Sequence, residues 1–273
     1  MKLFIAFVVA LTSSVLAEGV QARVHGNHQY LPQPFVEDST ALGIRCSRSV
    51  ARDTDKEHRV VTDGTWSGAI IFKKLCAGNF VSVTGRFTIP IPKHTCTSND
   101  TEKGSAWVGI SNYTYGSMLQ AGVDWEVERS GNVTYSAWYE WVPYLTTYLD
   151  DFEVRGGDVM QVDIATTTPT TANVRLINVS TGKDISIDAT AAPDSFLTGD
   201  NAEWVMEDFS DEGKLPPLAD FGEVVFTNAS AKTSTGWVED LGGATIINMV
   251  QDGKLVVDTH IPSLSQIAIK YVK

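Results

Sequence analysis

Carboxylates are the side chains of this sequence best suited to acid–base chemistry. The familiar hydrolase signatures are missing: there is no Gly-x-Ser-x-Gly elbow, no His-Glu-x-x-His zinc helix, and neither Asp-Thr-Gly nor Asp-Ser-Gly. Of the five histidines, only His94 and His260 follow the start of the strand pattern, and their sequence context indicates exposed surface positions. We therefore expect no metal site and no cofactor.

The carboxylates fall on predicted strands whose side chains alternate between two faces. On one strand the apolar residues share a face, and Gln120 and Asp124 lie on the other. Trp138 and Glu140 share a face of the next strand, and Glu207 lies among aromatic residues of a third. Bulky aromatic rings beside carboxylates favour a groove for an extended polymer over a plain solvated surface.

Most of these residues belong to five short segments that follow one another in a fixed order. The segments are WSGAI (66–70), AWVGI (106–110), LQAGVD (119–124), AWYEWVP (137–143) and NAEWVMEDF (201–209). In order and spacing they resemble the successive signatures of the glutamic peptidases, also called eqolisins. The similarity extends from about Trp66 to Val272, and five ordered motifs are far more specific than any single one.

The resemblance implies an all-β fold, an antiparallel sandwich of two large sheets with a concave substrate cleft. It also implies that Gln120 and Glu207 form the catalytic pair. Five further residues match positions that line or support the family's cleft: Trp66, Trp107, Asp124, Trp138 and Glu140. Ser111 and Ser136 depart from the family pattern, which often has Asp at both positions, and this departure bears on the charge and substrate preference of the cleft.

The functional groups of the pair suggest a mechanism for peptide hydrolysis. Glu207 takes a proton from a bound water, which attacks the peptide carbonyl, and then gives the proton to the leaving nitrogen. Gln120 orients the water and donates to the oxyanion, an interaction worth roughly 3 kcal/mol per donor in other enzymes. We therefore predict a secreted acid endopeptidase that acts on polypeptides.

Two other classes of protein fit parts of the pattern. A non-catalytic, lectin-like carbohydrate-binding sandwich also presents aromatic residues on a concave sheet. A glycosidase could use Glu140 and Glu207 as its two carboxylates. Cleavage of denatured casein or haemoglobin at acidic pH distinguishes a peptidase from both, and a glycosidase would release reducing sugar.

The elements that position these residues are predicted to be short strands. From Trp66 onward, runs rich in Val, Ile, Thr, Tyr and Trp alternate with period two between Gly, Asn, Asp and Pro. The predicted strands are residues 66–72, 80–89, 106–111, 118–127, 133–142, 159–167, 172–179, 202–208, 223–228, 245–251, 255–259 and 266–272. Many short strands in one domain must cover their edges, which favours a sandwich or a barrel.

The N-terminal part of the chain has a different character. Lys2, the apolar run 3–11 and the small residues near Ala17 predict a signal peptide over residues 1–17, since the run is too short for a membrane span. Residues 18–59 have little strand pattern and are predicted to be a propeptide, or alternatively a disordered arm. Residues 60–273 then form the glutamic peptidase domain.

Charge divides the chain at the same place. Seven of the 21 basic and six of the 33 acidic residues precede Val60, so 14 and 27 remain and the mature part carries a formal net charge of −13. Nucleic acid is therefore an improbable partner, because phosphate binding requires a basic patch. An acidic body suits a low-pH medium, where carboxylates lose charge and self-repulsion falls.

Cysteines and glycosylation motifs are consistent with an oxidising, extracellular location. Removal of the propeptide removes Cys46 and leaves Cys76 and Cys96, which we predict to pair, the alternative being two free thiols. Asn-x-Ser/Thr motifs predict glycosylation at five positions, Asn99, Asn112, Asn132, Asn178 and Asn228.

Basic residues in the predicted propeptide suggest how the enzyme is kept inactive. We expect Arg45, Arg48, Arg52 and Arg59 to lie against carboxylates of the cleft at neutral pH, so that the propeptide inhibits its own enzyme. Acid protonates the carboxylates and loosens the segment, whereas Arg stays charged. The alternative is that these arginines are merely solvated. We expect a monomer without a membrane partner.

Overall fold

A computed structural model describes residues 58–74, 77–112, 116–210 and 215–272. The predicted signal peptide and most of the predicted propeptide, with Cys46, Arg45, Arg48 and Arg52, lie outside the described residues, and so does Cys76. The regular secondary structure of the described residues is almost entirely strand. Its strands are β1 Val60–Asp63, β2 Trp66–Phe72, β3 Phe80–Thr88, β4 Glu102–Asn112, β5 Ser117–Val127, β6 Val133–Trp141, β7 Thr147–Tyr148, β8 Val159–Thr168, β9 Thr171–Asn178, β10 Lys183–Thr190, β11 Asn201–Glu207, β12 Glu223–Thr233, β13 Val238–Glu239, β14 Thr245–Gln251, β15 Lys254–Ser263 and β16 Gln266–Tyr271. A short 3-10 helix covers Leu241–Gly243.

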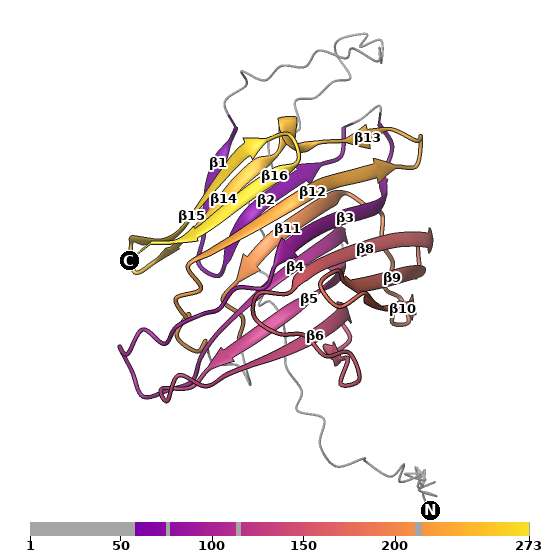
Figure 1. The fold of residues 1–273 in the computed structure, drawn as a ribbon. Coiled ribbons are helices and arrows are strands. Elements are labelled where there is room, and N and C mark those ends of the chain that lie inside the picture. The colour runs from indigo at the N-terminus through magenta and orange to yellow at the C-terminus, as the bar shows by residue number, and fades with distance from the viewer. Residues whose placement is uncertain (1–57, 75–76, 113–115, 211–214, 273) are drawn as a thin grey trace, which may run out of the picture.

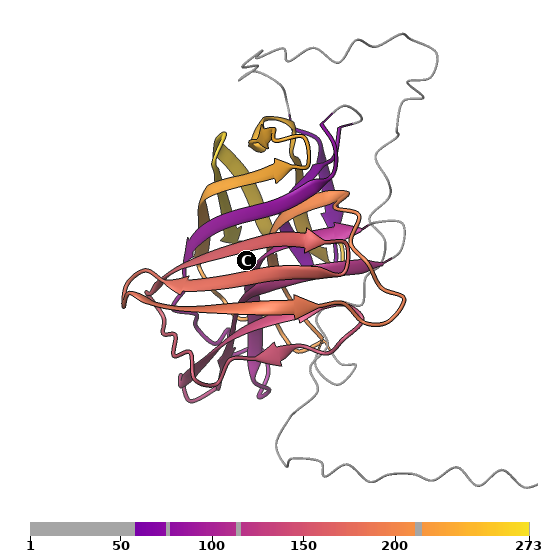
Figure 2. The same cartoon turned by 90° about the vertical axis from the view of Figure 1, so that its right-hand side faces the viewer.

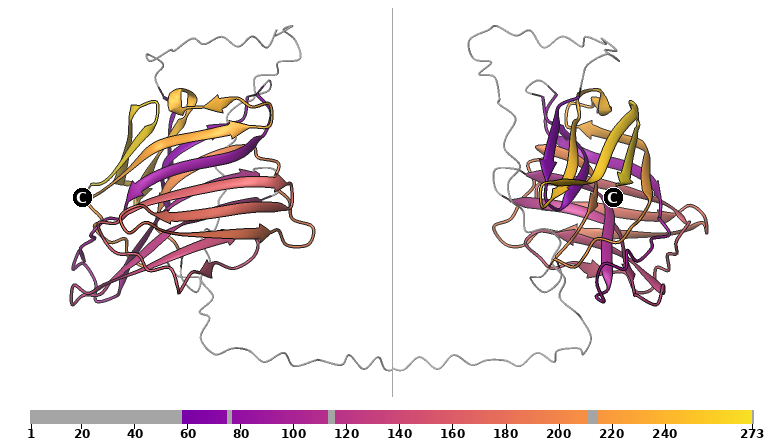
Figure 3. Two further views of the ribbon diagram at one scale, coloured as in Figure 1. Left: turned by 45° about the vertical axis from the view of Figure 1, so that its right-hand side comes forward. Right: turned by 90° about the vertical axis from the view of Figure 1, so that its left-hand side faces the viewer.

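The strands form one continuous hydrogen-bonded path that folds over into two layers. Its order is β10-β9-β8-β3-β12-β16-β15-β14-β2-β11-β4-β5-β6-β7, with β1 added to β14 and β13 to β12. β14, β15 and β16 lie at one end of the molecule and β5 and β6 at the other (Figure 1). β3, β8 and β9 lie side by side in the second layer (Figure 2), and Figure 3 shows both layers from further sides.

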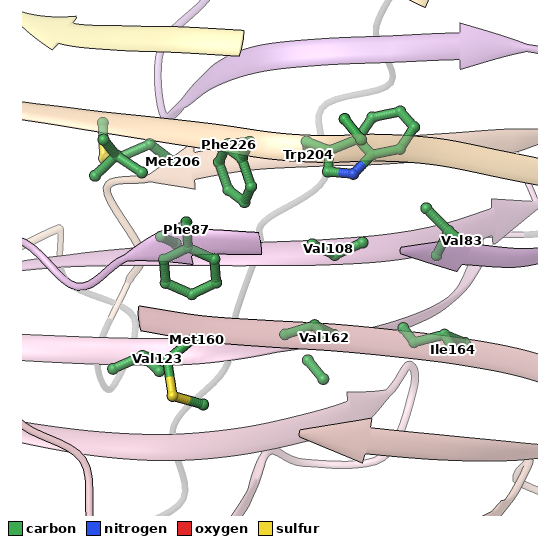
Figure 4. Packing of buried hydrophobic residues seen from close by; sticks show 14 of the residues in the cluster. Val83, Phe87, Val108, Val123, Met160, Val162, Ile164, Trp204, Met206 and Phe226 are labelled. Carbon is green, nitrogen blue, oxygen red and sulfur yellow. The ribbon is translucent and has the colours of Figure 1, made fainter. Parts of the chain in front are cut away.

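The core lies between the layers, because each strand turns its apolar positions inward. From one layer come Val108 of β4, Val123 of β5 and Trp204 of β11 (Figure 4). Phe87 of β3 and Val162 of β8 meet them from the other layer, and all five are at most 1% exposed. The opposite faces of β4, β5 and β11 are therefore directed away from the core and are available for a site.

The predicted all-β fold is confirmed, and the differences concern edges. β10 was not predicted because it is an edge strand whose residues are mostly exposed, so its alternation is weak. β1 was not predicted either, and it pairs in parallel with β14. β4 extends beyond the predicted residues 106–111 to Glu102, and β12 continues through a register shift after Thr227. The described residues include no helix long and apolar enough to cross a membrane.

Two predictions about single side chains are corrected. The His94 side chain is only 3% exposed: its Nε2 lies 2.9 Å from the Asp100 carbonyl, and its Nδ1 accepts from the Cys96 amide at 2.9 Å. The polar sequence context gave no sign of this local turn. His260, whose side chain is 67% exposed, is on the surface as predicted. Cys96 is a free, exposed cysteine, so the structure does not support the predicted disulfide to Cys76.

The five predicted glycosylation positions differ in accessibility. Asn99, Asn132 and Asn228 are exposed. Asn112 and Asn178 are 1% and 0% exposed, and their side-chain amides donate to the Phe196 carbonyl and to Asp158, respectively. Asn99, Asn132 and Asn228 are therefore the accessible acceptors, and glycosylation stays a prediction.

Candidate active site

Strand register places the predicted site residues on one face of one layer, which we call the site face. Three rows of residues in register cross β6, β5, β4 and β11, and we name each by its character. The amide row consists of Glu140, Gln120, Gly109 and Glu203. The tryptophan row follows as Trp138, Gly122, Trp107 and Val205. The carboxylate row is Ser136, Asp124, Ser105 and Glu207, and it continues to Trp66 of β2. Side chains two residues apart on a strand share a face, so all three rows point away from the core.

The tryptophan row forms a small apolar cluster that is separate from the main core. Trp107, Trp138, Val205 and Met118 are buried together, at most 4% exposed. A Cβ on Gly122 would lie 2.2 Å from the Ala106 carbonyl oxygen and 2.6 Å from the Trp107 Cβ. The close approach of β4 therefore leaves no room for a side chain at residue 122.

Gln120 is held by a chain of hydrogen bonds within the amide row. It is 0% exposed, and its Nε2 donates to Glu140 Oε2 at 2.6 Å. Thr146 Oγ1 in turn donates to Glu140 Oε1 at 3.2 Å. The NH₂ group of Gln120 therefore faces Glu140. Gln120 Oε1 accepts no hydrogen bond from the described residues.

Glu207 is held by the tryptophan row. It is 1% exposed, and its Oε2 accepts from Trp107 Nε1 at 2.8 Å. Trp66 stands edge-on to Trp107, with 5.0 Å between ring centroids and 78° between ring planes. These contacts fix one oxygen of the carboxylate in a site that excludes water, where electrostatic interactions are stronger than in solution.

Asp124 lies in the carboxylate row with Glu207. It is 1% exposed, and its Oδ2 accepts from the hydroxyl of Tyr148 at 3.0 Å. Ser136 is directly opposite Asp124 on β6, and Ser105 of β4 separates Asp124 from Glu207. Ser136 and Tyr148 also line a pocket of about 370 Å³ at the edge of β6.

Two buried carboxyls near the pair were not among the predicted site residues. Glu203 ends the amide row and is 2% exposed, and burial raises its pKa to about 7 despite hydrogen bonds from Ser111 and Asn201. Asp208 follows Glu207 and is 2% exposed. Burial also raises the pKa of Asp208 to about 7, opposed by the hydrogen bond from Gln251 and reinforced by the charge of Glu207. Their place inside the NAEWVMEDF motif was the one available signal.

The structure therefore brings all seven predicted site residues to one face. Gln120 and Glu207 belong to different rows, separated by the tryptophan row. Ser111, one of the two departures from the family pattern, donates to Glu203 at 2.6 Å. Among the described residues no group of three or more His, Cys, Asp or Glu could hold a metal ion. The residues offer a carboxylate, a fixed amide and aromatic walls.

A fixed amide and a buried carboxylate on one sheet face are groups that acid–base hydrolysis can use. Comparison with known proteins gives the family. The sequence model of the Peptidase A4 family matches residues 64–271, and the chain belongs to this family.

Individual relatives agree. The chain is 32% identical to aspergillopepsin-2 of Aspergillus niger over 92% of this chain and 90% of the relative. It is 27% identical to scytalidopepsin B of Scytalidium lignicola, over 96% and 98% of the two chains. A crystal structure of scytalido-glutamic peptidase with a transition state analog inhibitor has a TM-score of 0.67, with 28% identity over 77% of this chain and 99% of that one. Aspergilloglutamic peptidase from Aspergillus niger has a TM-score of 0.58, with 34% identity over 63% and 99%.

Proposed function

We propose that this glutamic-type endopeptidase hydrolyses peptide bonds with Gln120 and Glu207. The family and its glutamic peptidase members support the class of enzyme. The observation that carries the assignment of residues is that both side chains are buried on the site face and are held by hydrogen bonds from or to its other residues. Glu140 holds the Gln120 amide, and Trp107 holds one oxygen of Glu207.

Glu207 acts as the base and then as the acid. As a carboxylate it accepts a proton from the attacking water, and the protonated carboxyl passes this proton to the leaving nitrogen. The hydrogen bond from Trp107 fixes the orientation of the carboxylate through both steps. The surrounding apolar cluster keeps bulk water away from the proton in transit.

Gln120 acts as a neutral donor and acceptor. One N–H is directed to Glu140, which leaves the second N–H for the oxyanion and Oε1 for the attacking water. An amide does not titrate in acid, so this role persists at low pH. Glu140 acts through Gln120, because it sets which end of the amide faces the reacting carbonyl.

Substitutions of the pair test the assignment. Gln120→Ala should lower kcat at least 100-fold, since an oxyanion donor is worth about 3 kcal/mol. Glu207→Gln should be at least as damaging, because an amide cannot take up the water's proton. The assay is cleavage of denatured casein at acidic pH, with circular dichroism as the check on folding. Glu153→Gln, at an exposed position, is the matched control. Near wild-type turnover in either variant contradicts the assignment.

Processing and location are a separate part of the proposal. The sequence of residues 1–17 supports secretion, and the basic residues of 18–59 support an inhibitory propeptide. Arg59 is the one member of the predicted arginine latch within the described residues. It is exposed, and its carbonyl accepts from the Ile246 amide at 2.8 Å, so the latch proposal is carried by Arg45, Arg48 and Arg52. Neutralising Arg45, Arg48 and Arg52 should raise the pH at which processing begins, and an unchanged threshold would remove the latch altogether.

A further inference from the structure

The connection between β6 and β7 brings a tyrosine hydroxyl to the site face. β7 pairs with β6 so that Tyr148 lies opposite Trp138, and the Tyr148 ring packs against the tryptophan row. From there its hydroxyl donates to Asp124 Oδ2 at 3.0 Å. The same connection carries Thr146, which donates to Glu140. One short segment thus contacts a carboxylate of the amide row, Glu140, and one of the carboxylate row, Asp124.

The residue opposite Asp124 explains why this hydroxyl matters. Ser136 is in direct register with Asp124, and opposite residues on antiparallel strands have Cβ atoms about 5 Å apart. A longer side chain at residue 136 could reach Asp124, but within the described part of the chain Ser136 forms no hydrogen bond with it. Ser136 is also one of the two departures from the family sequence pattern, which often has Asp there. Tyr148 of β7 donates a hydrogen bond to Asp124.

We propose that Tyr148 is a positioning residue for peptide hydrolysis, which takes the place of a carboxyl at residue 136 in holding Asp124. This inference rests on the proposed function. Asp124 shares the carboxylate row with Glu207, about 10 Å away across two strand spacings, so its orientation and charge act on the base. A phenol stays protonated throughout the acidic range, so Tyr148 is a donor at every working pH.

Other charged groups lie close to this contact. Glu126 neighbours Asp124 on the same face of β5, and Lys103 of β4 places its Nζ 3.3 Å from Glu126 Oε1. Glu207 faces Asp124 from across β4. A test must therefore change the Tyr148 hydroxyl and leave these three groups unaltered.

The first test is Tyr148→Phe, which removes the hydroxyl and keeps the ring. We expect kcat for peptide cleavage to fall about tenfold, equivalent to about 1.4 kcal/mol, with KM changed less than about twofold. Tyr139→Phe is the control, because Tyr139 lies on β6, the strand that pairs with β7, but packs against the main core on the opposite face. Unchanged kcat in Tyr148→Phe, or an equal loss in Tyr139→Phe, overturns the proposal.

The second test asks whether a carboxyl at residue 136 restores the function. In Tyr148→Phe/Ser136→Asp, two carboxyls face each other and share one proton at acidic pH, so one of them donates to the other. Kcat should recover to within about threefold of the wild type at acidic pH and fall again as pH rises and both carboxyls ionise.

The outcomes separate this inference from the proposed function. A purely structural tyrosine would give no pH-dependent recovery, so its absence in the folded double variant overturns the positioning role. If the wild type is active and Tyr148→Phe is unaffected, the assignment of the catalytic pair stands and only the proposed role of Tyr148 is refuted. An inactive wild type removes the proposed function and this inference together.

Discussion

Burial of Glu203 predicts that the protein loses stability as pH rises toward neutrality. Glu203 is 2% exposed on β11; its Oε1 accepts from Ser111, and its Oε2 has no partner among the described residues. Burial raises its pKa from 4.5 to about 7, and the hydrogen bonds from Ser111 and Asn201 only partly oppose this. The folded state therefore favours the neutral carboxyl.

The sign and size of the effect follow from this shift. A carboxyl whose pKa is higher in the folded state than in the unfolded state binds its proton more tightly when folded. Its ionisation therefore costs folding free energy as pH rises from about 4.5 to about 7, and the loss is complete above that window. The shift from 4.5 to about 7 corresponds to about 3 kcal/mol. This is a large part of the 5–15 kcal/mol that stabilises a typical domain.

Glu203→Gln isolates this contribution. The amide keeps an acceptor for Ser111 but cannot ionise, so its free energy of unfolding should fall about 3 kcal/mol less than that of the wild type between pH 4 and pH 8. Urea denaturation at fixed pH values measures this difference. Glu153→Gln removes an exposed carboxyl, whose side chain is 70% accessible, and should follow the wild type. Parallel curves for Glu203→Gln and the wild type would refute the reasoning.

Three further predictions concern neighbouring residues. Asp208→Asn should flatten the same stability curve by about 4 kcal/mol, since the pKa is raised from 3.8 to about 7, and urea denaturation at several pH values measures it. Thr146→Val removes the donor to Glu140 and should lower kcat about threefold to tenfold at unchanged KM, because the amide row is held less firmly. Gly122→Ala should displace Trp107, which near-ultraviolet circular dichroism would detect, and should lower both stability and activity. Gly64→Ala, where an added Cβ meets nothing within 4 Å, should do neither.

Alternation along single strands was enough to predict which residues share a face. The separation of Gln120 and Asp124 from the apolar side of β5 is confirmed. What alternation cannot provide is register between strands, because a shift by two residues leaves every side chain on its face. The hydrogen bond from Gln120 to Glu140 depends on that register and could not be predicted.

The contacts made by the connection between β6 and β7 could not be predicted from the sequence, for a different reason. Thr146 and Tyr148 lie just past β6, in a stretch with no strand pattern of its own, and β7 is only two residues long. Their positions depend on where the chain turns after Trp141. The raised pKa of Glu203 was equally hidden, since the motif placed it next to aromatic residues without showing that it is 2% exposed.

In the proposed mechanism, Glu207 and the two buried carboxyls Glu203 and Asp208 have opposite pH requirements. As the base, Glu207 must be ionised to take the proton of the attacking water, which sets a lower limit on the working pH. Gln120 sets no limit, because an amide does not titrate. Glu203 and Asp208 are stable in the fold as neutral groups, and both ionise near pH 7. We therefore expect the upper limit to come from a loss of folding and not from a failure of the proton transfer itself. Activity and the circular dichroism of the folded state should then disappear at the same pH, and they should separate when Glu203 and Asp208 are both replaced by their amides.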